Sequence, residues 1–302
     1  MNYDDDRNLV NGYPYMKRWL EYAEQSIEEG LYFRSTNGKY WGLGDWLAPI
    51  GVDVKDRESI DLVNNCAMSQ CLHDMVHIAA HLGMTQDSVR YAAQLGTLNH
   101  NIHQTFYHGN GIYGTGSQID MAYPLLVGAV PDSRVAFVES VLLERTEKLH
   151  NNHIACGLVG VPVLTEWATL AGKCNFICRI LKQPDYPGYL FMKNSGASAV
   201  WESWNGERSR LHNCYNGIGS WFYQAVGGII PTEPGYRRVS ICPQTPDGLT
   251  WSEVTEETPY GILRVRWDRK KEKRILKVSI PVGITADIFG KTYGNGTYKI
   301  VF

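Results

Sequence analysis

The segment "SGASAVWESWNGERSRLH" contains the residues best suited to chemistry. Glu202 stands between Trp201 and Trp204, and His212 follows ten residues after the glutamate. Apolar neighbours remove water from a carboxylate and raise its pKa toward a value useful for general acid or base catalysis. The structural alternative is a glutamate that pairs with Arg208 or Arg210 at the start of a helix. We favour a catalytic Glu202.

A second segment, "WGLGDWLAP", holds Asp45 and Trp46 between glycines and a proline. Because glycine and proline interrupt helices, neither side chain lies in mid-helix. An indole on a loop with a carboxylate beside it can stack on a sugar ring and accept a hydrogen bond from a sugar hydroxyl. The same residues would suit a tryptophan that anchors a loop in the core, and composition leaves both interpretations open.

Two further groups of polar residues resemble sites but have simpler explanations. His73, His77 and His81 repeat every four residues, a spacing that can chelate zinc, but no glutamate follows the first histidine as in zinc-protease helices. We interpret them as a structural or exposed helix face, and we expect neither a metal nor another cofactor. Asp56 and Glu58 of "KDRES" are interpreted as negative charge that favours the start of a helix.

Composition narrows the class of partner. The chain has 9 Trp and 18 Tyr among 302 residues, and several stand beside glycine or polar residues, which favours contacts with carbohydrate rings. The formal net charge is −2, and charged residues make up 20% of the chain. We therefore expect no basic surface for nucleic acid or for an anionic membrane. No apolar stretch approaches the roughly 18 residues that a membrane span needs.

The cysteines and the N-terminus bear on the compartment. The seven cysteines lack the regular spacing of a disulfide framework and indicate reduced, mostly buried thiols. The first ten residues, "MNYDDDRNLV", have neither the positive start nor the apolar run of a signal peptide. Both features indicate a cytoplasmic chain as given, and a periplasmic or secreted location stays open if an N-terminal part is missing.

Up to about residue 230 the chain alternates helical patterns with loops rich in Gly, Asn and Tyr. Apolar periodicity and caps predict helices over 13–30, 59–83, 85–107, 117–127, 133–149, 162–171 and 173–181, and one more that starts near residue 213. Repeated helical hairpins of this kind stack into a ring or a solenoid. We predict one helical-hairpin domain over residues 1–230.

From residue 231 the pattern changes to short strands and turns. "ILRVRW" and "ILKVSI" alternate apolar and polar residues, and the charged "DRKKEKR" between them predicts a solvated hairpin loop. We predict a small antiparallel β-sandwich over residues 231–302.

Ordered motifs along nearly the whole chain resemble a known family. They are "GDWLAP", "IYGTGSQ", "HIACGLVGVPVLTE", "YPGYLFM", "SGASAVWESW", "GSWFYQAVGGI", "EPGYRRVSICPQ", "GLTW" and "TPYG". Together they closely resemble the second half of the bacterial α-L-rhamnosidases, which are six-hairpin glycoside hydrolases with a C-terminal β-domain. The resemblance implies a mainly α fold with a β domain: part of an (α/α)6 six-hairpin barrel followed by the β-sandwich.

The resemblance also implies inverting hydrolysis of terminal α-L-rhamnosides by two carboxyl groups. Glu202 of the W-E-x-W motif would be the base that deprotonates the attacking water. His212 would hydrogen-bond the sugar or the water near the anomeric carbon. Trp46 would stack on the ring, Asp45 could accept a bond from a hydroxyl, and Trp204 would line the same site.

Three departures from the family accompany these matches. The stretch between Glu202 and His212 is shorter than is usual, and the family's H-x-T-T-G reads "HIACG" here, without its two hydroxyls. The D-x-x-x-x-E-R-x-x-W-x-G-D stretch that carries the general acid is absent from these 302 residues. We therefore expect an incomplete catalytic domain for a rhamnose-containing oligosaccharide or glycoside, with a missing N-terminal half or self-association covering its open end.

Two other functions stay open at this point. A non-catalytic rhamnoside-binding protein would keep the sugar pocket without turnover. A six-hairpin glycosidase for another sugar would hydrolyse different aryl glycosides.

Overall fold

The chain forms two compact units, which we call the helical unit and the β unit. The helical unit comprises Arg7–Trp167 and Arg179–Asn216, and the β unit consists mainly of Ala168–Cys178 and Gly217–Phe302. The structure is a computed structural model that describes residues 5–35, 38–53, 55–271 and 273–302. The first four residues of the N-terminal stretch considered above lie outside this description.

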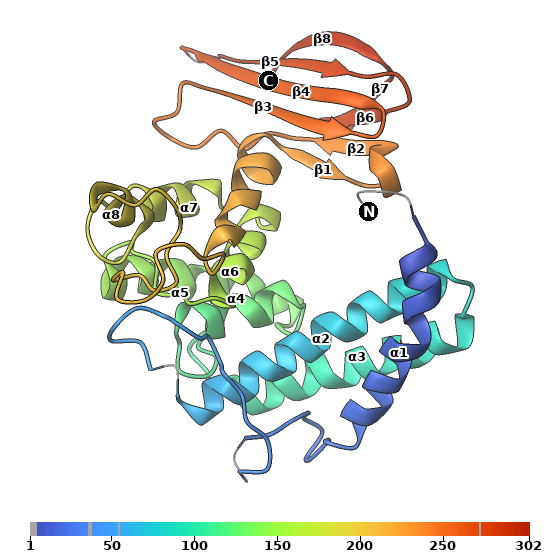
Figure 1. The fold of residues 1–302 in the computed structure, drawn as a ribbon, viewed down its shortest axis with the longest axis vertical. Coiled ribbons are helices and arrows are strands. Elements are labelled where there is room, and N and C mark those ends of the chain that lie inside the picture. Colours follow the sequence, from blue (N-terminus) through green and yellow to red (C-terminus); the bar gives the residue numbers. More distant parts are fainter. Residues whose placement is uncertain (1–4, 36–37, 54, 272) are drawn as a thin grey trace. The chain divides into compact units, whose positions relative to one another are not determined.

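Two helical hairpins form the framework of the helical unit, in which α2 packs along α3 and α4 packs along α5 (Figure 1). The described helices are Arg7–Glu24 (α1), Arg57–His81 (α2), Thr85–Phe106 (α3), Gln118–Leu126 (α4), Asp132–His150 (α5), Gly160–Leu170 (α6), Cys174–Leu181 (α7) and Tyr189–Asn194 (α8). Gly83, between α2 and α3, has φ +74°, a left-handed conformation that glycine adopts without a Cβ clash and that commonly follows a helix.

Helix α2 lies in the core of the helical unit. Its buried apolar side chains, which fall on more than one face as expected of a core helix, include Leu62, Val63, Cys66, Met68, Leu72 and Met75. The helix begins at a side-chain cap: Asp56 Oδ1 accepts hydrogen bonds from the amides of Glu58 and Ser59, at 2.9 and 3.0 Å. The interpretation of Asp56 as a residue that stabilises a helix start is confirmed.

Helix α1 differs from its prediction at both ends. It begins at Arg7 and ends at Glu24, well before the predicted stop at residue 30. The Ser26 hydroxyl donates to the carbonyl of Ala23 and accepts from the amide of Phe33. Such side-chain bonds to the backbone compete with helical bonds, and they explain the early end.

Two other elements were not predicted in their observed form. Helix α8, Tyr189–Asn194, falls outside the ranges for which the sequence predicts helices. The predicted helix near residue 213 is a short 3₁₀ turn, Asn216–Ile218 (η1), followed by a π-helix, Trp221–Val226 (η2). A π-helix has about one more residue per turn than an α-helix and is rare. Over a segment this short, apolar periodicity does not distinguish the two kinds of helix.

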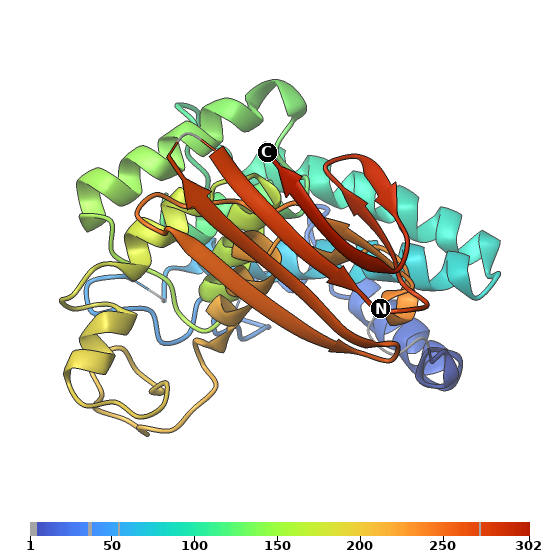
Figure 2. The same cartoon turned by 90° about the horizontal axis from the view of Figure 1, so that it is seen from above.

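The β unit contains two four-stranded sheets (Figures 1 and 2). One has the order β1-β2-β6-β7 and the other β3-β4-β5-β8. The strands are Ile229–Pro231 (β1), Arg238–Ile241 (β2), Trp251–Thr258 (β3), Gly261–Lys270 (β4), Lys273–Ile280 (β5), Thr285–Ile288 (β6), Lys291–Tyr293 (β7) and Gly296–Val301 (β8). All described pairs are antiparallel except β2 with β6, which is parallel and departs from the predicted antiparallel arrangement.

The hairpin of β4 and β5 is longer than predicted. Most of the charged stretch expected to form its loop extends the two strands, with Asp268 opposite Ile275 and Lys270 opposite Lys273. The Arg266 Nη2 atom lies 2.6 Å from Asp268 Oδ1, and both residues belong to β4. These charged side chains therefore lie on a strand and not in the loop. Residue 272 of this stretch lies outside the described residues.

Alternation along β4 and β5 buries one face of their sheet. The side chains buried there are Leu263, Val265, Trp267, Leu276, Val278 and Ile280. The Trp267 indole also donates to the carbonyl of Val226 at 2.8 Å, so the π-helix η2 is anchored to this core.

The described residues include all seven cysteines and the histidine repeat. All seven cysteines are free thiols, and only Cys242 is exposed. Among these residues, no helix is long and apolar enough to cross a membrane. The same portion of the chain holds no group of three or more His, Cys, Asp or Glu side chains placed to bind a metal.

We expect Asp56→Ala to lower the free energy of unfolding by about 1 kcal/mol, because two amides at the start of α2 lose their acceptor. Urea unfolding followed by circular dichroism measures the change. Asp56→Ser, which keeps a capping oxygen, should recover most of the stability. Equal losses in both variants would contradict the capping role.

Candidate active site

Asp45 anchors the loop that precedes α2 to the start of α6. Its side chain is buried, and Oδ2 accepts from the amide of Gly157 at 2.7 Å. Oδ1 accepts from the amides of Val159 and Gly160, at 3.2 and 2.7 Å. Because α6 begins at Gly160, the carboxylate caps this helix from a distant part of the sequence, where the helix dipole also favours negative charge.

The same two loops approach each other so closely that glycine is required. A Cβ atom at Gly157 would lie 2.2 Å from the carbonyl oxygen of Trp46, and one at Gly160 would lie 2.4 Å from Asp45 Oδ2. The Leu158 amide donates to the Trp46 carbonyl at 2.7 Å. These contacts fix the backbone on both sides of the Trp46 indole.

Burial raises the pKa of Asp45 to about 6, because desolvation outweighs the three amide hydrogen bonds that lower it. The described partners of this carboxylate are all backbone amides. The structure therefore gives Asp45 the role of holding the loop, and its contact with a sugar hydroxyl stays a prediction.

Trp204 supports the Glu202 segment from inside the protein. Its indole is 2% exposed and stacks on Tyr215, with ring centroids 4.0 Å apart. Its Nε1 donates to the carbonyl of Cys156 at 2.8 Å. This burial favours the positioning of Glu202 over contact with a ligand, and the contact of Trp204 with a sugar stays a prediction.

Tyr215 connects the Glu202 segment to the Trp46 loop. Its hydroxyl donates to the Leu47 carbonyl at 2.7 Å and lies 3.2 Å from the Glu202 carbonyl. Leu47 has φ +64°, a left-handed conformation that costs free energy in a residue with a Cβ atom. The tyrosine helps hold this strained residue directly after Trp46.

Glu202 lies on a loop closed by its own backbone and side chain. Its amide donates to the Ser209 carbonyl at 2.8 Å, and its Oε2 accepts from the Ser209 amide at 3.2 Å. Arg208 Nη1 lies 3.6 Å from Glu202 Oε1. The Glu202 side chain is 25% exposed, so the carboxylate is partly open to water while two groups orient it.

Arg208 brings the carboxylate and Trp46 into one cluster. Its guanidinium carbon lies 5.7 Å from the centre of the Trp46 ring, within the range of a cation–π interaction. From the sequence, an arginine that pairs with Glu202 at the start of a helix is the structural alternative to a catalytic glutamate. Arg208 is that partner, but it lies in a loop and also contacts the indole.

His212 is exposed and is held by Cys214. The Cys214 Sγ lies 2.8 Å from His212 Nδ1. Burial, and then the charge of Glu202, raise the pKa of the Cys214 thiol, so a protonated thiol lies beside Nδ1 and can donate to it. When the thiol donates to Nδ1, a neutral imidazole carries its proton on Nε2, which can then donate to a ligand. Cys214 is not among the residues that the sequence predicts for the site.

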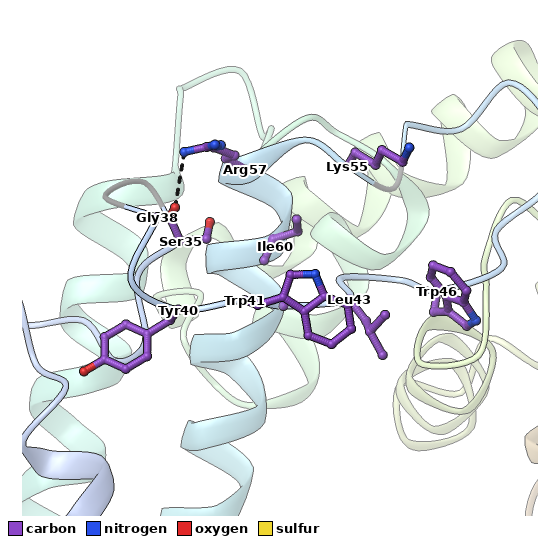
Figure 3. A pocket seen from close by; sticks show the side chains of 10 residues that line it. Ser35, Gly38, Tyr40, Trp41, Leu43, Trp46, Lys55, Arg57 and Ile60 are labelled. Atoms are coloured by element: carbon purple, nitrogen blue, oxygen red, sulfur yellow. Dashed lines mark hydrogen bonds between the residues drawn. The ribbon is translucent and has the colours of Figure 1, made fainter.

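A cavity of about 400 Å³ adjoins Trp46 (Figure 3). Its lining residues are Ser35, Gly38, Tyr40, Trp41, Gly42, Leu43, Trp46, Lys55, Arg57 and Ile60. The aromatic residues come from the loop before α2, and Arg57 is the first residue of that helix. The glycines around Trp41 in the sequence could have indicated an exposed indole there.

Comparison with known proteins identifies the class. Residues 1–226 match the bacterial alpha-L-rhamnosidase six-hairpin glycosidase domain, and residues 228–291 match the bacterial alpha-L-rhamnosidase C-terminal domain. The chain belongs to the bacterial α-L-rhamnosidase family. It is 26% identical to an α-L-rhamnosidase of Alteromonas sp. (strain LOR) and 24% identical to one of Formosa agariphila. These matches cover 94% and 97% of the chain but 32% of each relative, so the chain spans about a third of their length.

Solved structures confirm the fold class. The α-L-rhamnosidase of Streptomyces avermitilis, solved in complex with L-rhamnose, matches the whole chain with a TM-score of 0.88 at 21% identity. The enzyme from Dictyoglumus thermophilum matches with a TM-score of 0.90 at 20% identity. The chain covers 31% and 38% of those two proteins. Its fold is part of a six-hairpin barrel followed by a small β-sandwich.

Replacement of Asp45 by Asn tests the buried carboxyl through the pH dependence of stability. Because the folded-state pKa of about 6 exceeds the unfolded value, the folded protein binds more protons between the two pKa values, and its stability falls as pH rises. The unfolding free energy of the parent minus that of Asp45→Asn should fall by roughly 3 kcal/mol from pH 3.5 to pH 6.5. Urea unfolding at a series of pH values measures this difference, and a constant or rising difference would contradict the assignment.

Proposed function

We propose that this chain supplies the water-activating side of an inverting α-L-rhamnosidase site. Glu202 is the general base, Trp46 is the platform for the rhamnose ring, and His212 hydrogen-bonds the sugar or the attacking water. The observation that carries this proposal is the cluster of Glu202, Arg208 and Trp46, in which one guanidinium contacts both a partly exposed carboxylate and an indole. Membership of the rhamnosidase family supports the choice of sugar.

The geometry around Glu202 suits a base. The Ser209 amide and the Arg208 guanidinium orient the two carboxylate oxygens, and the remaining lone pairs can accept a proton from water. Water attacks the anomeric carbon as Glu202 takes its proton, and the bond to the leaving oxygen breaks. A general acid must protonate that oxygen.

We propose that the general acid lies outside these 302 residues. Inverting glycosidases place two carboxyl groups roughly 6.5–9.5 Å apart across the sugar, so Glu202 alone is not sufficient. Two facts support an external acid: the chain spans about a third of its relatives' length, and the family's acid-bearing stretch is absent from the sequence given. A preceding part of the polypeptide or a second chain would supply it.

The division into a catalytic part over residues 1–230 and a β-domain over 231–302 belongs to the same proposal. The two family matches meet at residues 226–228 and support it. The compact β unit, however, also includes Ala168–Cys178 and starts its second segment at Gly217, so structural units and sequence domains divide the chain differently.

A series of leaving groups tests base and acid separately. The isolated chain should hydrolyse 2,4-dinitrophenyl α-L-rhamnoside, whose phenolate leaves without a proton, far faster than an alkyl rhamnoside. General acid catalysis contributes about 10²–10⁴-fold, and only the alkyl substrate depends on it. Glu202→Gln should reduce turnover of the activated substrate at least about 100-fold, and proton NMR should show β-L-rhamnose as the first product.

Glu207→Gln is the matched control, because Glu207 is exposed and lies on the same loop. It should leave turnover unchanged. Equal turnover of alkyl and dinitrophenyl substrates would place an acid within the chain. Binding of L-rhamnose without turnover of the activated substrate would favour the sugar-binding protein, and turnover of other aryl glycosides alone would favour a different glycosidase.

Trp46→Ala should weaken binding of L-rhamnose about tenfold, because the sugar loses the aromatic face on which it stacks. Isothermal titration calorimetry measures the affinity. Trp251→Ala, which removes an indole that is 55% exposed in the β unit, should not change it. Equal effects of the two substitutions would contradict a specific platform at Trp46.

A further inference from the structure

We propose that Cys214 is a positioning residue that holds His212 as a hydrogen-bond donor to the sugar. The thiol donates to Nδ1 of the imidazole, so Nε2 carries the ring proton and donates it to an oxygen atom of the rhamnose. This inference rests on the proposed function, which leaves the sugar and the attacking water as alternative partners of His212. It selects the sugar.

The sulfur atom that holds the imidazole is fixed from the core. Cys214 is 4% exposed, and its Sγ lies 2.8 Å from His212 Nδ1. The next residue, Tyr215, is fully buried and stacks on Trp204. His212 itself is exposed. An exposed ring is therefore attached to a buried group whose own position is set by aromatic packing.

The backbone of His212 is held at a second point. Its amide donates to the carbonyl of Val200 at 2.8 Å, two residues before Glu202. The Glu202 amide in turn donates to the carbonyl of Ser209 at 2.8 Å. These bonds join the two ends of the loop that carries the proposed base. With its amide bonded to Val200 and its ring held by the thiol, His212 has little freedom to turn away from the Glu202 segment.

The chemistry of the two groups makes the thiol the donor. Burial, and then the charge of Glu202, raise the pKa of the Cys214 thiol, so the sulfur keeps its proton near neutral pH. The unprotonated nitrogen of a neutral imidazole is a regular acceptor, whereas a sulfur atom is a weak one. The reverse bond, from Nδ1 to Sγ, would use the poorer acceptor of the two.

This tautomer limits what His212 can do. Nδ1 accepts from the thiol and Nε2 carries a proton, so a neutral His212 has no free lone pair with which to take a proton from water. Glu202 then has no competitor from His212 as the base. The attacking water needs electron density for its bond to the anomeric carbon, and a donor to that water would withdraw some of it. A sugar hydroxyl accepts from Nε2 without this cost.

NMR of the intact chain tests the tautomer without any turnover. Protein labelled with ¹⁵N-histidine is studied at about pH 8, where histidine side chains are ordinarily neutral. Long-range ¹H–¹⁵N spectra distinguish a protonated from an unprotonated ring nitrogen, and the signals that His212→Asn removes belong to His212. We expect one tautomer, with the proton on Nε2. Cys214→Ala should populate both tautomers, whereas Cys214→Ser, whose hydroxyl can also donate, should keep one.

Binding and turnover together identify the partner of Nε2. Cys214→Ala should weaken L-rhamnose binding about threefold in isothermal titration calorimetry, because the bond from His212 is no longer preorganised. For 2,4-dinitrophenyl α-L-rhamnoside, KM should rise by a similar factor while kcat changes less than about twofold. Cys214→Ser should recover most of the affinity.

Cys178→Ala is the matched control. It removes another buried thiol, whose Sγ lies 4.0 Å from the carbonyl of Asp247 in the β unit. It should change neither the His212 spectrum nor the affinity for L-rhamnose. The unfolding midpoint of each variant shows that the comparison is made between folded proteins.

Each outcome decides the inference. A protonated Nδ1 in the parent, or a His212 spectrum that Cys214→Ala leaves unchanged, overturns the positioning role, and the effect of Glu202→Gln on turnover still decides the proposed function. A fall in kcat with unchanged L-rhamnose binding assigns Nε2 to the water and overturns the sugar contact. Failure of the parent to bind L-rhamnose overturns the sugar contact and the proposed function together.

Discussion

The candidate site depends on one buried carboxylate. Asp45 accepts three amide hydrogen bonds at the start of α6, and it does so from a loop more than a hundred residues earlier in the chain. A carboxylate removed from water is costly unless its hydrogen-bonding capacity is used, and the amides at a helix start are strong partners for it. This interaction fixes the backbone next to Trp46, so the indole is presented from a constrained loop.

A second set of contacts brings the Glu202 segment to the same place. Trp204 and Tyr215 stack in the core, the Trp204 indole bonds to the carbonyl of Cys156, and the Tyr215 hydroxyl bonds to the carbonyl of Leu47. Cys156 directly precedes Gly157, whose amide bonds to Asp45. Three segments therefore meet around one small group of polar contacts. These contacts, and not a helix or strand formed by the three segments, keep the partly exposed Glu202 carboxylate near the Trp46 indole.

The arrangement separates rigid support from exposed chemistry. Asp45, Trp204 and Tyr215 are buried, whereas Glu202, Arg208 and His212 retain contact with water. Groups that buried residues already hold in place lose little conformational freedom when a ligand binds, so ordering them costs little free energy. The cavity beside Trp46 extends the exposed side, since its aromatic residues lie on the loop that Asp45 anchors.

Local patterns in the sequence determined much of the fold. Helices α2 to α5 and the strands β4 and β5 follow from periodicity, caps and alternation, which depend on neighbours within a few residues. The ordered motifs indicated the family, and the W-E-x-W motif marked Glu202. Tertiary structure alone decided that Trp204 is buried, with its indole bonded to the Cys156 carbonyl. It also decided that Asp45 caps α6 and that Arg208 lies between Glu202 and Trp46. These outcomes depend on partners distant in the chain, and spacing along a sequence carries no information about which distant groups satisfy a buried charge or cover an aromatic ring.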